Sequence, residues 1–313
     1  MARAVRKRRA AQWLWVVVAA VATFELAAGL WIRTTVPAES SWKAASELVR
    51  ARFRSADRIV AAPGWIDPIV RFHLGDLLTL HSAAPSDLAG FERIWELSIR
   101  GASTRDAPPD FEARFGRVQA RMWRISSDAV GYDFVEHVDQ AQVEWVYDHE
   151  PRACPWRETP GGRGGLGRGP MAPKRRFVCD PERPWLWVGA TVLADRTLTP
   201  RRCVWQHPAG PDPVRVTFFE VPLSDRLVVH GGIDYEHERW ERGSPVTLQI
   251  WISDRLAGEL VHRDGDGWSE LEIDTSDFAS DRATVRFETT TQDPAARVFC
   301  WSASTRARGV KRE

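Results

Sequence analysis

Hydrophobic and polar positions are distributed in three different ways along this chain, and each distribution predicts a different kind of element. Residues 10–32 form an almost unbroken apolar run whose one charged side chain is Glu25. As a helix this run would be about 34 Å long, enough to cross the roughly 30 Å hydrocarbon core of a membrane. The run therefore predicts a transmembrane helix over 10–32.

The residues that flank this run predict its orientation. Residues 1–9 carry five Lys and Arg side chains and form a basic tail. Trp13 and Trp15 stand at one end of the run and Trp31 near the other, where aromatic side chains favour the membrane interface. Because basic tails stay on the cytoplasmic side, we expect a single-pass protein of the inner (cytoplasmic) membrane. The bulk of the chain would then be periplasmic or extracellular.

A cleaved signal peptide is the competing interpretation of the same run. Val36, Pro37 and Ala38 would satisfy a small-residue cleavage rule, but the run exceeds the 7–15 apolar residues of a signal peptide. We therefore favour an uncleaved anchor, and both interpretations export the same soluble part. Glu25 is costly at membrane depth, so it is either protonated near the interface or in contact with a membrane partner.

Apolar residues at helical spacing and then at strand spacing follow the anchor. The order of helices and strands predicts a small α/β domain over 39–150. Its expected helices cover 39–55 and 69–78, and its expected strands 57–63, 92–100, 117–124, 130–135 and 142–147.

Part of this domain resembles a known family. The segments Ile59–Pro63, Phe72–Gly75 and Arg93–Trp95 combine a strand ending in proline, a helix with aromatic and glycine residues, and a strand carrying Arg and Trp. Over 42–101 this is similar to the soluble domain of polyprenyl-phosphate-dependent (GT-C type) glycosyltransferases. The resemblance implies a shared scaffold that docks near such a membrane enzyme. It does not imply transferase activity, because the family's many membrane helices and its catalytic acidic residue are absent.

The third pattern begins near 184, where short alternating segments are separated by turns rich in Gly, Pro and Asp. Strands at this spacing predict a β-sandwich over 184–305, and about eight of them predict a jelly roll. The order of four segments over 200–305 resembles galactose-binding-like jelly rolls, which implies a carbohydrate-binding-like domain. These segments are Leu227–Ile233, Pro245–Ile252, Trp268–Ile273 and Ala283–Thr289. The fold class expected is therefore an α+β, two-domain exported protein with a basic tail over 306–313.

The stretch between the two domains, 151–183, is rich in Gly and Arg and is expected to be a surface loop. Gly162, Gly164 and Gly167 match the spacing of a dinucleotide-binding loop, but no strand precedes them and Pro170 follows. We therefore expect no cofactor. A formal net charge of +1, from 43 basic and 42 acidic residues, also argues against a nucleic-acid partner.

Four cysteines in an exported chain favour two disulfides, for which three connectivities exist. We prefer Cys154–Cys179, which closes the Gly/Arg-rich loop, and Cys203–Cys300, which ties the first strand of the sandwich to the last. No Cys-x-x-Cys pair occurs, so no metal is expected.

Signatures of catalysis are few. The segment 132–139 gathers acidic residues and His137, but a solvated strand or turn explains it more simply than an acid–base site. Asp264 and Asp266 resemble the start of a calcium loop, yet later ligands are missing, so a β-turn is expected. No Gly-x-Ser-x-Gly, His-Glu-x-x-His or Walker motif occurs. A catalytic residue is therefore not assigned.

Sixteen tryptophans make sugar stacking the best-supported chemistry, although most of them belong to a core. Trp240 is the preferred ligand-binding residue, with His237, Glu238 and Arg239 placed to hydrogen-bond hydroxyls. The chain is thus expected to be a membrane-anchored envelope accessory protein that binds glycan or supports glycan-handling enzymes without catalysis. Two alternatives stay open: an envelope hydrolase using paired carboxylates, and a purely structural subunit of a membrane complex that contacts its partner through Glu25.

Overall fold

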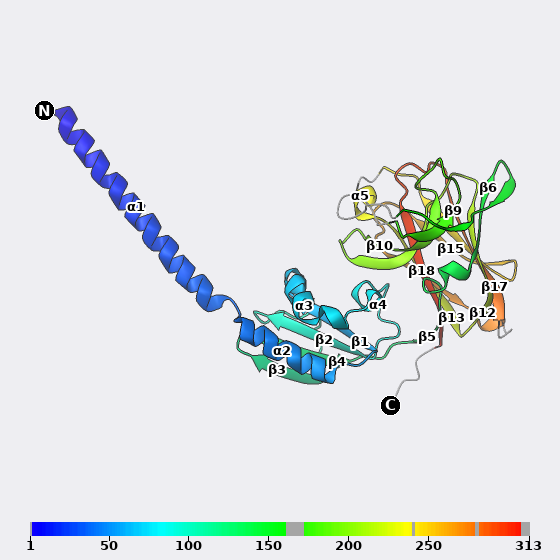
Figure 1. Cartoon of the computed structure of the whole chain (residues 1–313), viewed down its shortest axis with the longest axis horizontal. Coiled ribbons are helices and arrows are strands. Elements are labelled where there is room, and N and C mark those ends of the chain that lie inside the picture. The colour runs from blue at the N-terminus through cyan, green and yellow to red at the C-terminus, as the bar shows by residue number, and fades with distance from the viewer. Residues whose placement is uncertain (1, 161–171, 240–241, 279–281, 308–313) are drawn as a thin grey trace. The chain divides into compact units, whose positions relative to one another are not determined.

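The computed structural model divides into two compact units (Figure 1). It describes residues 2–160, 172–239, 242–278 and 282–307, with side chains from residue 15 onward. Unit 1 comprises Met1–Leu77 and Arg93–Arg124, and unit 2 comprises Leu78–Glu92 and Ile125–Glu313. Each unit is described by itself below.

Unit 1 begins with the long helix α1 (Ala2–Thr35), and its described part is long and apolar enough to cross a membrane. A small α/β domain follows, with four strands in the order β1-β2-β4-β3. Strands β1 and β2 are parallel, and the other neighbours are antiparallel. The elements are α2 (Glu39–Arg52), β1 (Asp57–Ala62), η1 (Gly64–Ile66), α3 (Asp67–Leu74), η2 (Gly75–Leu77), β2 (Arg93–Ile99), β3 (Phe111–Phe115) and β4 (Val118–Arg124).

The apolar faces of two helices close the core of this domain. Helix α2 packs on β3, β4 and α3, and α3 packs on β1. Trp42 and Val49 of α2 are buried, as are Val70 and Leu74 of α3, at the helical spacing that places them on one face. The helix and strand pattern expected over 39–124 is therefore present.

Asp57 joins the two parallel strands at their beginning. Its buried carboxylate accepts hydrogen bonds from the Arg93 side chain at 2.7 and 2.6 Å, from Trp95 Nε1 at 3.1 Å and from the backbone N–H of Arg54 at 2.8 Å. A buried carboxylate needs this degree of pairing, because an unpaired charge in the interior costs several kcal/mol.

Unit 2 is a β-sandwich. Its eight consecutive strands from β11 to β18 fall into two sheets with the orders β16-β13-β18-β11 and β15-β14-β17-β12. This is the eight-strand, double-sheet arrangement of a jelly roll. The elements are β11 (Pro200–Gln206), β12 (Val214–Pro222), β13 (Arg226–Ile233), α5 (Tyr235–Glu238), β14 (Val246–Ile252), β15 (Arg255–His262), β16 (Ser269–Asp274), η4 (Ser276–Phe278), β17 (Arg282–Thr291) and β18 (Phe299–Ala307).

The core lies between the two sheets. Alternate residues of each strand point inward, as the period of two requires, and pack with those of the facing sheet. Trp301 of β18 stacks on Phe287 of β17, with ring centroids 4.0 Å apart, and its Nε1 donates to Gln206 at 2.7 Å. The ring contact crosses from one sheet to the other, and Gln206, on β11 of the same sheet as Trp301, reaches across as well by donating to Phe287 O at 3.2 Å.

The boundary between the units differs from the expected domain limits of 39–150, 151–183 and 184–305. Residues from 125 onward extend the sandwich, because β5 pairs with β18 and β6 pairs with β12. Parts of the expected loop are strands as well, since Trp156 pairs with Phe177 across β8 and β9. The added elements are α4 (Leu80–Ala83), β5 (Ala129–Asp133), η3 (Val138–Gln140), β6 (Gln142–Tyr147), β7 (Glu150–Ala153), β8 (Trp156–Glu158), β9 (Arg175–Val178) and β10 (Trp187–Ala194).

Two disulfides hold unit 2, Cys154–Cys179 and Cys203–Cys300, the same pairs preferred from the sequence. The second one joins β11 to β18, which are neighbours in the sheet. Because β11 is the first strand of the jelly roll and β18 is the last, this bond ties together strands that are 97 residues apart in the chain.

Candidate functional site

The segment that carries the preferred glycan-binding residues follows β13 and forms the short helix α5. Asp234 caps it, since its side chain accepts a hydrogen bond from the backbone N–H of His237 at 3.2 Å and contacts the His237 ring. Arg239 pairs with Glu236 at 3.5 Å, and its side chain is 51% exposed. His237 and Arg239 are thus accessible and held by their own segment.

Glu238 has a different position from the one expected. Its side chain is fully buried and does not reach the surface. The expectation that Glu238 hydrogen-bonds a sugar hydroxyl is therefore wrong. One carboxylate oxygen accepts from the backbone N–H groups of Gly267 at 2.7 Å and Gly265 at 3.2 Å. His262 Nε2 lies 3.5 Å from the same oxygen. Glu238 therefore fastens α5 to the turn that connects β15 and β16.

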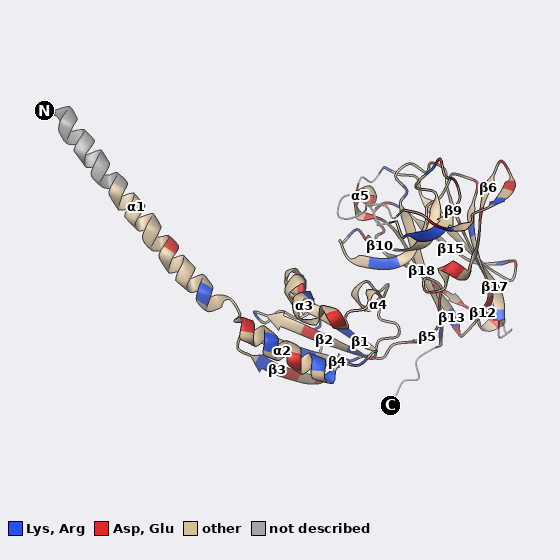
Figure 2. Ribbon diagram, in the orientation of Figure 1, with Lys and Arg blue, Asp and Glu red and all other residues tan. Residues whose placement is uncertain are grey.

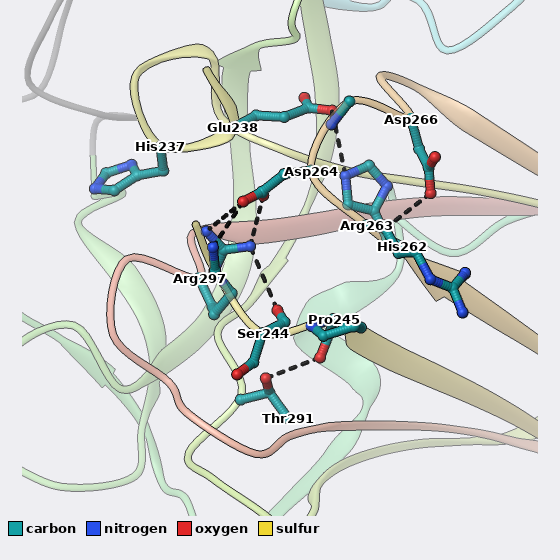
Figure 3. Close-up of polar contacts among 12 residues, drawn as sticks. His237, Glu238, Ser244, Pro245, His262, Arg263, Asp264, Asp266, Thr291 and Arg297 are labelled. Atoms are coloured by element: carbon teal, nitrogen blue, oxygen red, sulfur yellow. Dashed lines mark hydrogen bonds and ion pairs between the residues drawn. The ribbon is translucent and has the colours of Figure 1, made fainter. Parts of the chain in front are cut away.

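A second buried pair supports the other side of this turn. Asp264 accepts from Arg297 at 2.6 Å (Figure 3) and from the backbone N–H of Gly243 at 2.8 Å. Burial alone would raise the pKa of Asp264, but the hydrogen bonds from Arg297 and Gly243 outweigh it and lower that pKa. The turn expected at 264–267 is thus present, and its first carboxylate is engaged with the chain itself.

An aromatic group that the sequence did not single out lies near this network. The half-buried ring of Trp185 packs against His207, with centroids 4.5 Å apart. Burial, the largest cause, together with the charges of His237 and Arg297 lowers the pKa of His207 to about 4, against the opposing effect of its hydrogen bond with Pro208 O. Backbone contacts place Trp185 and His207 in the neighbourhood of α5: Trp205, two residues before His207, pairs with Cys300, and the N–H of Asp234, the cap of α5, donates to Val298 O at 3.1 Å. In the sequence Trp185 is one of two tryptophans in an apolar run, which gives no sign of this position.

Trp240 lies outside the described residues, so its place relative to His237 and Arg239 stays a prediction. Glu25 lies on α1 with its side chain exposed.

A second cluster of polar groups forms on the same sheet through β13 and β16. The ring of His230 lies 3.0 Å from a Glu270 carboxylate oxygen and 3.7 Å from one of Asp87. Residues 87, 230 and 270 are distant in sequence, and no spacing rule connects them. The fold therefore brings together a pair of carboxylates around a histidine that sequence analysis missed.

The charged groups of this cluster interact mainly with one another and with Arg306. The three ligand atoms lie within 4.8 Å of one another, close enough to face a metal ion. However, Arg306 pairs with Asp87 at 2.6 Å and supplies the positive charge that a cation would otherwise bring. The cavity beside Asp87 and His230 measures about 40 Å³, which is space for water rather than for a sugar ring.

Among the known proteins compared with this chain, only solved structures show a similarity to it. No protein-family model matches the chain. No curated protein matches it either.

Three solved structures illustrate that likeness. The CBM51 of Clostridium perfringens GH95, solved in complex with methyl-galactose, has a TM-score of 0.28 and 6% identity over 37% of this chain and 81% of its own. The CBM51-2 and INT domains of Clostridium perfringens ZmpB, in complex with GlcNAc, have a TM-score of 0.33 and 10% identity over 67% of this chain and 40% of their own. The C-terminal extracellular domain of Mycobacterium tuberculosis EmbC has a TM-score of 0.20 and 17% identity over 35% of this chain and 43% of its own. All three TM-scores lie below 0.5. The fold is therefore assigned from the strand order, and the function is argued from the geometry of the site.

Proposed function

We propose that this protein is a membrane-anchored, extracytoplasmic glycan-binding protein that catalyses no reaction itself. Helix α1 would hold the chain in the membrane, and the jelly roll would bind the sugar. The length and apolar character of α1 support the anchor. Two disulfides support an oxidising compartment for unit 2.

The observation that carries this proposal is the buried network beneath α5. Glu238 and Asp264 are both engaged by backbone N–H groups, and Asp264 is also paired with Arg297, which is 1% exposed. Such a network holds α5 and the neighbouring turn in one geometry through contacts among the chain's own residues. A surface fixed in this way loses little conformational entropy when it binds, which favours affinity.

The proposed site places each side chain by its accessibility. His237 and Arg239 would hydrogen-bond sugar hydroxyls, and Trp240 would stack on the ring of the sugar. Trp185 offers a second aromatic surface close by. Glu238, which is buried, would act by holding α5 in place rather than by touching the glycan.

Binding of the full-length protein to a panel of envelope glycans and lipid-linked saccharides tests this proposal. We expect saturable binding to at least one class, weakened about tenfold in Trp185→Ala and in Trp240→Ala because each loses a stacking surface. Trp251→Ala is the matched control, since this half-buried tryptophan belongs to β14 of the other sheet. Equal loss in all three variants, or no binding to any glycan, would refute the proposed site.

A second candidate function, an envelope hydrolase, would use the pair of carboxylates around His230, and it ranks below glycan binding because the cavity beside them measures about 40 Å³, too small for a sugar ring. Asp87 and Glu270 could act as acid and base if the pairing of Asp87 with Arg306 left its carboxylate available. Incubating the same glycan panel with the protein and analysing the products by mass spectrometry separates the two functions. Cleavage that is abolished in Glu270→Gln would establish the hydrolase.

We also propose a membrane partner at Glu25, for which a glycosyltransferase-type membrane protein is the candidate. A carboxylate inside an apolar span is costly unless another polar group approaches it. Affinity capture of the anchored full-length protein, compared with that of Glu25→Leu, tests the contact. Identical captured proteins in the two samples would remove its basis.

A further inference from the structure

Unit 1 exposes an apolar helix face that the proposed glycan site does not use. Trp65, Ile69 and Phe72 follow one another at spacings of four and three residues, so they lie on one side of η1 and α3. Trp65 is 61% exposed, Ile69 39% and Phe72 81%. The opposite side of the same segment is buried through Ile66, Val70 and Leu74. We call these three exposed residues the Trp65 face.

An arginine cluster borders this face. Arg100, Arg114 and Arg117 line a cavity of about 120 Å³ together with Gln119. The Arg100 guanidinium also lies over the ring of Trp65, 5.7 Å from its centroid. Arg100 therefore connects the cationic cavity to the Trp65 face, and the two form one continuous surface.

The charge of this surface is uncompensated within the part of the chain that the structure describes. The ion pairs recorded there leave Arg100, Arg114 and Arg117 without a carboxylate partner, and all three side chains are exposed. On β3, Figure 2 shows one basic and one acidic position, which are Arg114 and Glu112. An exposed combination of Trp, Phe and Arg is the composition that favours a membrane interface.

The chain itself brings this surface to a membrane. Thr35, the last residue of α1, and Pro37 line the same cavity as the arginines. Helix α2 begins at Glu39, four residues later, so it starts at most about 14 Å from the end of α1. The headgroup layer extends about 5–8 Å beyond the hydrocarbon core, and the surface therefore lies within reach of it.

We propose that the Trp65 face and the arginine cluster dock on anionic phospholipid headgroups of the leaflet in which α1 ends. Trp65, Ile69 and Phe72 enter the interface, and the three arginines bind headgroup phosphates. This proposal rests on the anchor in the proposed function. It is independent of glycan binding, because every residue named here belongs to unit 1.

The test uses the full-length protein in lipid nanodiscs and hydrogen–deuterium exchange of peptides covering 64–74 and 100–117. We expect slower exchange in discs of phosphatidylcholine mixed with phosphatidylglycerol than in discs of phosphatidylcholine alone. One arginine near an anionic surface shifts the docking equilibrium about fivefold. Each of Arg100→Gln, Arg114→Gln and Arg117→Gln should therefore reduce the protection by about that factor. Lys43→Gln, an exposed cation of α2, is the matched control and should change nothing.

A double variant, Trp65→Ser with Phe72→Ser, should abolish protection in both kinds of disc, and both side chains are exposed enough for the fold to be retained. Equal exchange in the two lipid compositions, unaffected by the arginine variants, would overturn the docking surface. Failure of the full chain to enter nanodiscs at all would instead overturn the anchor, so the two failures are distinguishable.

Discussion

In unit 1, the strands β1 and β2 are joined at their beginning by the buried Asp57 and Arg93, whereas in unit 2 the strands β11 and β18 are joined by the Cys203–Cys300 disulfide. One link depends on a charge that must stay paired, and the other on a covalent bond that a reductant breaks. The two units therefore have different vulnerabilities. Variants that weaken one link should leave the other unit unchanged.

The largest effect is expected from the disulfides of unit 2. In the loop-closure model a bond between residues 97 apart stabilises the folded state by about 4.7 kcal/mol, and one between residues 25 apart by about 3.5 kcal/mol. Replacing Cys203 and Cys300 with Ser should lower the stability of unit 2 more than replacing Cys154 and Cys179. Thermal unfolding followed by hydrogen exchange reports each unit separately. A fall in the stability of unit 1 in either variant would contradict the comparison.

The next effect concerns the ion pair of unit 1. Asp57→Asn leaves the guanidinium of Arg93, whose side chain is 12% exposed, without its anionic partner, and breaking a buried pair costs about 3–5 kcal/mol. Exchange in β1 and β2 should accelerate while exchange in β11 and β18 stays as before. Asp106→Asn, an exposed carboxylate of the same unit, is the control. Equal destabilisation by both variants would show that the charge of Asp57 carries no special role.

A smaller effect distinguishes the units by pH. The folded pKa of His207 is about 4 and its ordinary value is 6.5, so the unfolded chain binds more protons between these limits. Unit 2 should keep its full stability above pH 6.5 and lose about 3 kcal/mol as the pH falls toward 4. In His207→Gln this loss should be smaller when unfolding is measured across the same range. An unchanged pH dependence would assign the loss to other groups, among them His230, whose pKa is also lowered by burial.

Local patterns predicted the elements better than they predicted the limits of the units. The strands at 57–62, 93–99 and 142–147 follow from alternation and apolar runs, and all three are present. Residues 78–92 belong to unit 2 because the backbone N–H of Arg202 donates to Ala84 O at 2.7 Å. No local property of that segment indicates a contact more than a hundred residues away.

In the candidate site too, features set by neighbouring residues were predictable and features set by long-range packing were not. Asp234, the cap of α5, and the turn at 264–267 are features of short sequence range, and a turn was expected there. The burial of Glu238 depends on where the Gly265 and Gly267 N–H groups lie, which only the packing of the sandwich determines. Asp87, His230 and Glu270 come from separate segments and meet only when β13 and β16 pair. The roles of these side chains depend on tertiary packing, so the spacing of residues along the sequence could not predict them.

The strand order of the sandwich has a consequence for how this protein is made. Among the strands that the structure describes, β18 is the last to emerge, yet it lies in the middle of its sheet, between β13 and β11. Until Phe299–Ala307 has been synthesised, β13 and β11 have no common neighbour and Cys203 has no partner. A premature stop anywhere before this strand therefore removes the centre of the sheet rather than its margin. In the proposed extracytoplasmic location, quality control should accordingly encounter either the complete sandwich or an open sheet that is a substrate for proteases.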